Sequence, residues 1–583
     1  MEKIAENQTR TQLADALIHE TMLPFTHGIA SASLVGAYLD WASHLAVSPG
    51  KQCDMLESAA RKWAEWVMYV SNSAIGNCAP CAQPQPQDKR FRDAAWGKIP
   101  FNWSAQAFLS LEQWWSDAMI DVPGVSLHHQ NVAEFVTRQW LDVWSPSNFV
   151  SSNPEVLRYT IASSGGNLVR GASNWQHDAM DLLAHRKPRG TEAFVPGKDV
   201  ALTPGKVIYR NHLIELIQYA PATKTTFPEP VLIVPAWIMK YYILDLSPHN
   251  SLVKYLVDRG HTVFMISWNN PTKDDRGLAI SDYLDMGIMS ALRTIKEVTP
   301  KKQIHAVGYC LGGTLLAIAA ATLARDGDPI LASMTLLASQ LDFKEPGQLG
   351  LFIDESQIAY LESIMAAQGY LDGRQMAGAF ALINSKDLVW SKLVHEYLMG
   401  GQTPLTDLRA WNADATRMPY RMHSEYLRKL YLNNDLAGGR FAVNGKPIAL
   451  QDLRLPIFVV STESDHVSPW ESVFKVHLLT DCETTYVLTT GGHNVGIVNP
   501  PVESAKHKGY SYKIMTRAPE GQYIDPEAWL LQADQQEGSW WPAWQAWLAR
   551  RSSKAVAALP IAGRLSSKMT DFDDAPGRYV GIV

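Results

Sequence analysis

Two hydrophobic patterns divide the chain near residue 190. Before that point, segments such as 104–120 and 131–144 place apolar residues at i, i+3 and i+4 spacing, which predicts amphipathic helices. After it, helical patterns alternate with the short apolar runs PVLIVP, TVFMISW, QIHAVGY, SMTLLAS, PIFVVST and TTYVLTT. Near-continuous apolar strands separated by helices are typical of a parallel sheet that is buried on both faces. We therefore predict an α/β fold, a mostly parallel sheet with helices on both faces, preceded by a mainly helical domain over residues 1–190.

Two segments interrupt these patterns. From residue 342 to about 440 the strand–helix alternation stops, and the sequence is helical, aromatic and Met-bearing. Because this stretch lies between two predicted strands, we expect it to form an inserted cap in a domain of residues 191–583. The Pro- and Gln-rich stretch 76–90 predicts a flexible link. Its Cys78-Ala-Pro-Cys81 motif lacks the second cysteine pair that a zinc site requires, so we predict no metal site there.

Composition excludes several classes of function. The formal net charge of −6 gives no electrostatic attraction for nucleic acid or for an anionic membrane. The polar N-terminus does not resemble a signal peptide, and no apolar run reaches the roughly 18 residues of a membrane span. Five cysteines in 583 residues do not make a disulfide framework. We expect a cytoplasmic protein with reduced thiols, no nucleic-acid partner and no transmembrane segment.

The most informative motif is Gly308-Tyr309-Cys310-Leu311-Gly312, where a predicted strand turns into an Ala- and Leu-rich helix. It fits G-x-nucleophile-x-G, the elbow of the α/β-hydrolases, with Cys in place of Ser. The glycines are expected because the backbone at such a turn is strained and tightly packed. The N-terminus of the following helix favours the thiolate of Cys310. The backbone N–H of Leu311 would point toward a developing oxyanion.

Two later strands supply the expected partners of this thiol. In α/β-hydrolases an acid and then a histidine follow the nucleophile along the chain. Asp465 lies in the turn after the run PIFVVST, and His493 follows two glycines after the next strand. Active sites of open α/β sheets lie at such C-terminal strand ends. We predict that Cys310 is the nucleophile, His493 the general base and Asp465 its acidic partner. His466 adjoins Asp465, but neighbouring residues in a turn rarely converge on one point, so we interpret it as structural.

A second oxyanion donor is expected in the loop that follows an early strand. The candidate is the backbone N–H of Trp237 or of the adjacent Ala236. No phosphate-binding glycine loop is present in the sequence, so the residues that would recognise a nucleotide-containing substrate are not visible. We expect neither a cofactor nor a metal ion.

Several motifs together resemble the polyhydroxyalkanoate synthases in order and spacing: GYCLGGT, KYYILDL, HTVFMISWNNP, SDHVSPW, GGHNVGIVNPP and GSWWPAWQAWL. With WSPSNFVSSNPEV and GGNLVRG, the resemblance covers about residues 95–583 and leaves the first 90 or so outside. It implies a polymerase that converts (R)-3-hydroxyacyl-CoA into polyester and free CoA at the surface of a cytoplasmic granule. It also implies the nucleophile, base and acid roles for Cys310, His493 and Asp465. The GYC…GGT form and the single long chain are similar to the one-subunit, short-monomer class. We accordingly expect 3-hydroxybutyryl-CoA as the substrate, and a homodimer.

Two other interpretations stay open. An intracellular thioesterase or polyester depolymerase could use the same three residues, and its only product would be free acid. A granule-coating scaffold would instead leave Cys310 inert. The polymerase requires that water be excluded while a hydroxyl group attacks the bound acyl group. The aromatic segment 342–440 is our candidate for that exclusion.

Overall fold

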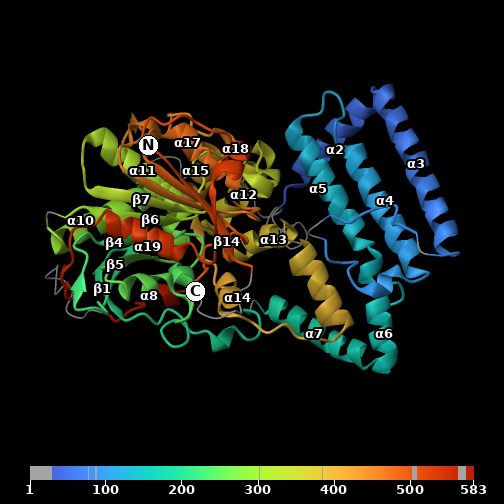
Figure 1. Ribbon diagram of the computed structural model, residues 1–583, viewed down its shortest axis with the longest axis horizontal. Coiled ribbons are helices and arrows are strands. Elements are labelled where there is room, and N and C mark those ends of the chain that lie inside the picture. Colours follow the sequence, from blue (N-terminus) through green and yellow to red (C-terminus); the bar gives the residue numbers. More distant parts are fainter. Residues whose placement is uncertain are drawn as a thin grey trace. The chain divides into compact units, whose positions relative to one another are not determined.

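The computed structural model describes residues 29–583 apart from 77, 86, 87, 185, 301, 384, 502–508 and 562–572. The described chain forms two compact units, which we call the helical unit and the sheet unit (Figure 1). The helical unit runs to Pro188 and also includes Gly378–Pro404. The sheet unit comprises Arg189–Ala377 and Leu405–Val583. The predicted domain division at residue 190 and the predicted cap over about 342–440 stay predictions.

The helical unit is formed by long helices, as the apolar spacing before residue 190 predicts. They are α2 Ser31–Ala46, α3 Pro49–Ser73, α4 Phe101–Met119, α5 Leu127–Val143, α6 Pro154–Ala162 and α7 Gly166–Leu183. Helix α2 packs on α5, and α4 packs on both α3 and α5. Local sequence sets where some of them begin. Ser126 caps α5, and Asn153 caps α6 by accepting hydrogen bonds from the N–H groups of Glu155 and Val156.

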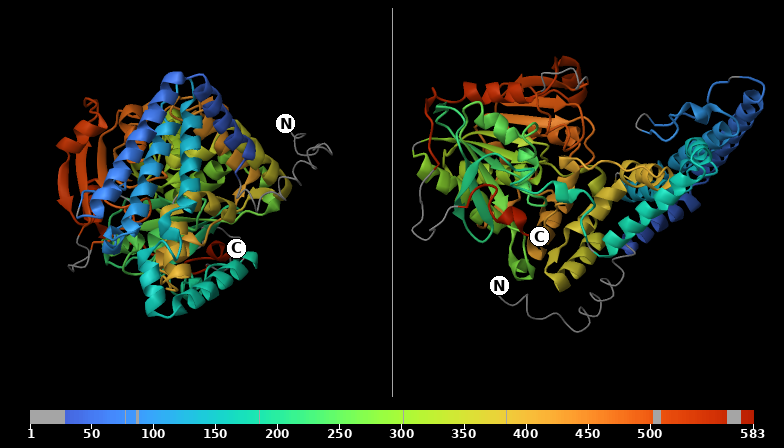
Figure 2. Two further views of the ribbon diagram at one scale, coloured as in Figure 1. Left: turned by 90° about the vertical axis from the view of Figure 1, so that its right-hand side faces the viewer. Right: turned by 90° about the horizontal axis from the view of Figure 1, so that it is seen from below.

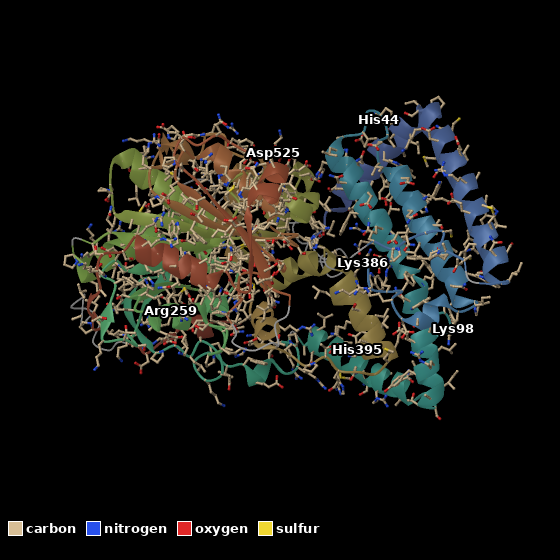
Figure 3. The ribbon with its side chains drawn as sticks, in the orientation of Figure 1. His44, Lys98, Arg259, Lys386, His395 and Asp525 are labelled. Atoms are coloured by element: carbon tan, nitrogen blue, oxygen red, sulfur yellow. The ribbon has the colours of Figure 1, made fainter. Side chains whose placement is uncertain are left out.

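The segment 378–404 packs against α7 within the helical unit. It contains the end of α13 Gly373–Ile383 and the π-helical turns η8 Lys386–Trp390 and η9 Leu393–Leu398. Asn167 donates its side-chain N–H to the carbonyl of Leu398 at 2.7 Å. A Cβ at Gly171 would overlap the carbonyl oxygen of Tyr397, so only glycine permits this approach. Two residues of the segment, Lys386 and His395, are labelled in Figure 3.

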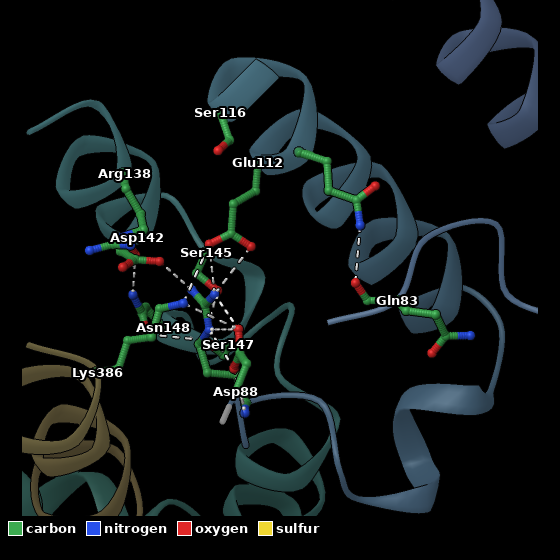
Figure 4. Close-up of polar contacts among 12 residues, drawn as sticks. Gln83, Asp88, Glu112, Ser116, Arg138, Asp142, Ser145, Ser147, Asn148 and Lys386 are labelled. Carbon is green, nitrogen blue, oxygen red and sulfur yellow. Dashed lines mark hydrogen bonds and ion pairs between the residues drawn. The ribbon is translucent and has the colours of Figure 1, made fainter. Parts of the chain in front are cut away.

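A partly buried set of charges, here called the ionic cluster, lies inside the helical unit (Figure 4). Its members are Asp88, Arg90, Glu112, Asp142 and Lys386. The guanidinium of Arg90 donates to Asp88 at 3.0 Å and to Asp142 at 2.5 Å, and Lys386 lies 3.6 Å from Glu112. The described part of the predicted flexible link 76–90 is therefore anchored at its end, since Arg90 is fixed by these carboxylates.

The sheet unit is built on a ten-stranded sheet. Its order is β1 Gly205–Arg210, β2 Ile214–Tyr219, β5 Val263–Trp268, β4 Val231–Val234, β6 Ile304–Tyr309, β7 Leu331–Leu337, β12 Ile457–Thr462, β13 Thr484–Thr489, β14 Ser511–Arg517 and β15 Asp534–Glu537. The six central strands, from β5 to β13 in this order, run parallel to one another. At each edge the two remaining strands pair antiparallel with their neighbours. Every apolar run predicted as a strand lies in this sheet. The predicted mostly parallel sheet is thus confirmed.

Helices cover both faces of the sheet, as predicted. They are α8 Leu252–Val257, α9 Ile280–Asp282, α10 Ser290–Val298, α11 Leu311–Asp326, α16 Trp470–Phe474, α17 Val476–Leu479, α18 Pro526–Gln532 and α19 Trp541–Arg550. The alternation of side chains along β6 separates the two faces. Gly308 faces the start of α11, whereas His305, of opposite parity, hydrogen-bonds Ser552 just beyond α19 at 3.1 Å. Trp544 of α19 also donates to Thr335 of β7 at 3.0 Å.

Strands β14 and β15 extend the sheet beyond the predicted strands (Figure 2). They pair antiparallel at the edge, and all residues of β15 are exposed. The polar sequence of β15 gave no apolar run to indicate a strand.

The inserted segment separates β7 from β12, which are neighbours in the sheet. Its described elements in the sheet unit are η7 Gly347–Phe352, α12 Glu355–Gln368, β8 Tyr370–Leu371, α14 Asp407–Asn412, β9 Met418–Pro419, α15 Tyr420–Tyr426 and η10 Leu427–Leu432. Strands β8 and β9 pair antiparallel and join two parts of the insertion that are far apart in the sequence. Across the described residues, no helix combines the length and the apolar character needed to cross a membrane.

Candidate active site

Cys310 occupies a strained turn between β6 and α11. Its φ of 52° lies in a region that non-glycine residues rarely adopt. A Cβ at Gly308 would lie 2.2 Å from the Cα of Gly313, and one at Gly312 would lie 2.2 Å from the carbonyl oxygen of Val234. Only glycine fits at either position, which explains the glycines on both sides of the thiol.

The backbone of Cys310 is fixed from both sides. Its N–H donates to the carbonyl of Leu337 at 2.8 Å, and its own carbonyl accepts from the N–H of Gly313 at 2.9 Å. Helix α11 begins at Leu311, whose N–H belongs to the first turn and has no partner within an α-helix. The turn thus presents a buried thiol beside the positive end of a helix dipole.

Asp465 and His493 form a hydrogen-bonded pair, as predicted from their order in the sequence. The Nδ1 of His493 lies 2.8 Å from Oδ2 of Asp465. The other carboxylate oxygen of Asp465 accepts from the backbone N–H groups of Val467 at 2.9 Å and Ser468 at 2.7 Å. These bonds orient the carboxylate toward the imidazole and leave the second ring nitrogen of His493 available.

Cys310 lies close enough to His493 to influence its pKa, so the structure brings the three predicted residues together. Burial on its own would lower the pKa of His493, but Asp465 and Cys310 outweigh it and raise that pKa well above its usual value. Burial would raise the pKa of Asp465, but His493 and the two backbone N–H groups hold it below its usual value. The surroundings therefore favour a protonated His493 beside the Asp465 carboxylate.

His466 does not take part in this arrangement. Its side chain is exposed, and its backbone carbonyl accepts from the N–H of Gln348 at 3.3 Å. The carboxylate of the adjacent Asp465 is directed to His493. The placement agrees with a structural interpretation of His466, and its role stays a prediction.

The loop after β4 lies beside the elbow, where a second oxyanion donor is expected. Gly312 approaches the carbonyl oxygens of Val234 and Pro235 so closely that a Cβ would collide with both. Ala236 and Trp237 follow directly and are buried. The carbonyl of Trp237 accepts the hydroxyl of Thr416 at 2.5 Å. The role of the N–H groups of Trp237 and Leu311 stays a prediction.

Sequence inspection did not single out the aromatic residues beside the thiol. Tyr426 donates its hydroxyl to Tyr431 at 3.1 Å, and the Tyr426 ring lies 6.0 Å from that of Trp237. Burial raises the pKa of both tyrosines, with smaller contributions from Cys310, which lies near them. Burial lowers the pKa of the adjacent His423 to about 3, so its imidazole is neutral. These side chains surround the thiol with apolar and uncharged groups.

The spacing of the two tyrosines explains why they were missed. They stand five residues apart, which in an α-helix turns side chains about 140° away from each other. Here Tyr426 immediately precedes the π-helical turn η10 and Tyr431 lies within it, and hydrogen bonds in such a turn connect residues i and i+5. An α-helical period would place the two side chains on different faces.

Among the described residues, no group of three or more His, Cys, Asp and Glu side chains is arranged to hold a metal ion. Cys78 and Cys81, considered above as a metal site, are both free thiols. The thiol of Cys81 donates to the side-chain oxygen of Gln106 at 3.2 Å. The predicted catalytic residues, in contrast, converge on one buried thiol.

Comparison with known sequences gives three family matches. The N-terminus of poly-β-hydroxybutyrate polymerase (PhaC) matches residues 87–256, and the α/β hydrolase fold matches residues 229–500. A second model, the poly-β-hydroxybutyrate polymerase N terminal, matches residues 9–51. This last match corrects our expectation that the first 90 or so residues lie outside the resemblance.

Similar proteins cover nearly the whole chain. A poly(3-hydroxyalkanoate) polymerase of Methylorubrum extorquens is 41% identical over 91% of this chain and 86% of its own. A poly(3-hydroxyalkanoate) polymerase subunit PhaC of Rhizobium meliloti is 38% identical over 96% of this chain and 89% of its own. Among solved structures, a monoacylglycerol lipase of Paleococcus ferrophilus matches 57% of this chain and 99% of its own, with 12% identity and a TM-score of 0.32.

Proposed function

The chain belongs to the poly(3-hydroxyalkanoate) polymerase family, whose members are acyltransferases. From this premise we propose that it polymerises (R)-3-hydroxybutyryl-CoA through a thioester on Cys310. The observation that carries the proposal is the His493–Asp465 hydrogen bond beside Cys310 at the elbow after β6. Such an arrangement activates a nucleophile and holds its base in place.

In the first step, the thiolate of Cys310 attacks the carbonyl carbon of the acyl-CoA. The bond between that carbon and the CoA sulfur breaks, and the leaving sulfur takes the proton of the His493 imidazolium. The raised pKa of His493 supports this role, because the imidazolium is present before the attack. One thioester replaces another, so the step is nearly isoenergetic and the bound acyl group stays reactive.

In the second step, the 3-hydroxyl of another hydroxyacyl unit attacks the acyl group on Cys310. The free ring nitrogen of His493 takes the hydroxyl proton, an ester bond forms, and the carbon–sulfur bond to Cys310 breaks. Asp465 keeps the imidazole oriented through Nδ1 in both steps. The backbone N–H groups of Leu311 and Trp237 would stabilise the oxyanion in each step.

Water must be kept from the acyl group during elongation, because its attack would give free acid. Of the tyrosines of the inserted segment near Cys310, Tyr426 is buried and Tyr431 is partly buried, and neither offers the thiol a charged group. Burial raises the pKa of each phenol, so both stay protonated at neutral pH. This environment supports polymer transfer over hydrolysis.

The finer assignments are also proposals. We assign the chain to the one-subunit, short-monomer class on its GYC…GGT motif and its single long chain. Family membership supports a site of action at the surface of a cytoplasmic polyester granule. A homodimer is the oligomeric state that we propose.

The deciding experiment is incubation of the full chain with 3-hydroxybutyryl-CoA while CoA release and polymer are measured together. The proposal expects both, with acyl-enzyme on Cys310 detectable by mass spectrometry. CoA release with free 3-hydroxybutyrate as the only product would identify a thioesterase instead. Absence of both CoA release and iodoacetamide labelling of Cys310 would favour a non-catalytic scaffold.

A further inference from the structure

Residues 411–416 of the inserted segment touch the loop that carries the proposed oxyanion donor. Trp411 donates its indole N–H to the carbonyl of Lys240 at 2.7 Å. Thr416 donates its hydroxyl to the carbonyl of Trp237 at 2.5 Å. Both bonds end on the backbone, so they fix the course of the loop itself. The insertion thus helps to position the loop after β4, which carries the proposed oxyanion donor.

The same short stretch also reaches the loop of the proposed base. Asn412, the last residue of α14, accepts a hydrogen bond from the side-chain N–H of Asn494 at 3.3 Å. Asn494 directly follows His493 in the sequence. Residues 411–416 are therefore linked to both loops that flank Cys310.

Asn494 is held from its other side by the nucleophile strand. Its side-chain oxygen accepts the hydroxyl of Tyr309 at 2.6 Å. Tyr309 immediately precedes Cys310, and its ring lies 5.7 Å from that of His493. Burial raises the pKa of Tyr309 well above its usual value, so the phenol stays protonated and remains a donor.

The base loop needs such a link because its own backbone is permissive. Gly491 has a φ of 106°, and Gly492 follows it, so two glycines precede His493. The backbone of the loop is held at its ends by Ser464 N–H to the Gly491 carbonyl at 3.0 Å and by the Trp540 indole to the Gly496 carbonyl at 2.9 Å. Within it, the N–H groups of Gly496 and Val498 donate to the carbonyls of Gly492 and Asn494, each at 2.9 Å. Between these points the side chain of Asn494 joins the loop to β6 and to α14.

We propose that Asn494 and Asn412 are positioning residues that align His493 with Cys310 when residues 411–416 are seated on the loop after β4. Asn412 fixes one side of the Asn494 amide and Tyr309 fixes the other. One movement of the inserted segment would then release the base and the oxyanion loop together. The inference rests on the proposed role of His493 as the base.

The test compares the full-length variants Asn494→Ala, Tyr309→Phe, Asn412→Ala and Asn412→Asp, with Asn433→Ala as the matched control. The side chain of Asn433 is exposed on the same insertion. kcat and KM for CoA release from 3-hydroxybutyryl-CoA are measured, together with the rate of Cys310 alkylation by iodoacetamide. Asn412→Asp keeps the oxygen that accepts from Asn494, whereas Asn412→Ala removes it.

We expect Asn494→Ala and Tyr309→Phe to lower kcat about 10- to 100-fold, the usual effect of removing a group that orients a catalytic ligand. KM should change little, because the lost interaction acts on the base and not on substrate binding. Asn412→Ala should lose about tenfold in kcat and Asn412→Asp should recover most of it. The double variant Tyr309→Phe/Asn494→Ala should be no slower than the slower single variant, because both remove one linkage.

Three results would overturn the proposal: a normal kcat for Asn412→Ala, an Asn412→Asp variant as slow as Asn412→Ala, or a loss confined to KM. If Asn494→Ala does not fold, Tyr309→Phe and Asn412→Ala still test the link from its two ends. His493→Gln is measured in the same assay. If His493→Gln is fully active, the proposed base is wrong, whereas an inactive His493→Gln beside a normal Asn412→Ala removes only the positioning role.

Discussion

The ionic cluster of the helical unit and the Cys310 site of the sheet unit both hold buried charges, but they arrange their hydrogen bonds differently. In the cluster, three carboxylates and two cations bind one another side chain to side chain, with Arg90 donating to three of them. At the Cys310 site, Asp465 is fixed largely by backbone N–H groups, and His493 keeps one nitrogen for the thiol. The first arrangement pairs each charged side chain with one of opposite sign, whereas the second leaves the thiol and one imidazole nitrogen for the proposed reaction.

The comparison predicts which substitutions should lower stability and which should lower activity. Removing one member of the ionic cluster leaves the remaining charges without a partner of opposite sign, which lowers the free energy of unfolding. Removing a member of the Cys310 site deletes a chemical step, and a small side chain in a turn contributes little to folding. The predictions below test that separation, beginning with the largest effect.

Cys310→Ala should abolish CoA release while the protein keeps its fold, because no covalent intermediate can form. The measurement is CoA release from 3-hydroxybutyryl-CoA, with circular dichroism and thermal unfolding as the check on folding. Activity above a few per cent of the parent would show that Cys310 is not the nucleophile.

His493→Gln should lower kcat by about 10⁴-fold, since members of a catalytic series act as a unit. His466→Gln is the matched control, and we expect it to keep most of the activity because its side chain is exposed. Steady-state kinetics of the two variants measure the difference. The opposite ranking would transfer the base to His466.

Cys310→Ser should acylate slowly and then stall. Serine fits the elbow, but its oxygen ester is a less reactive acyl donor than a thioester, and each elongation step requires that donor to be attacked again. Intact-protein mass spectrometry after exposure to 3-hydroxybutyryl-CoA, beside a polymer assay, follows both events. Long polymer made at the parent rate would contradict the need for a thioester.

Arg90→Met should lower the free energy of unfolding by about 3–5 kcal/mol, the range found when one partner of a buried ion pair is removed. kcat per folded molecule should stay within about twofold, because the cluster contains no reacting group. Urea unfolding and CoA release are measured on the same preparation, with exposed Lys89→Met as the control. A large loss of kcat with unchanged stability would contradict the separation between a stabilising cluster and a reactive site.

The smallest effect concerns the pKa of His493. Burial lowers this pKa and Asp465 and Cys310 raise it, so Cys310→Ala should reduce it. A histidine with a raised folded pKa contributes stability that is complete below its unfolded pKa of about 6.5 and is lost as pH rises through the raised value. The variant should therefore lose this contribution at a lower pH than the parent. Histidine-selective NMR titration gives the pKa, and an unchanged value would mean that Cys310 does not interact with the imidazole.

Much of the sheet unit could be predicted because its strands are apolar and the Cys310 motif has a fixed geometry. Asp465 and His493 were found because parallel strands place their C-terminal ends at one edge of a sheet. Strand β15 was not found, since every residue of it is exposed. The pair Tyr426 and Tyr431 was not found because a π-helical turn changes which residues share a face.

The ionic cluster shows a different limit of sequence inspection. Arg90 stands at the end of a Pro- and Gln-rich stretch whose composition is typical of a link. Its partners Glu112 and Asp142 are separated from it by 22 and 52 positions, and the second cation of the cluster, Lys386, by nearly 300. Charges that far apart give no periodic signal, so only the folded chain reveals their contact.

The segment 378–404 has a consequence for exchanging parts between members of the family. Although it lies in the middle of the catalytic sequence, its neighbours are residues such as Asn167 and Gly171 of the helical unit. A chimera that joins the first 188 residues of one relative to the remainder of another would split this interface between two parents. The two pieces must be inherited together, so the smallest exchangeable module of this protein is discontinuous.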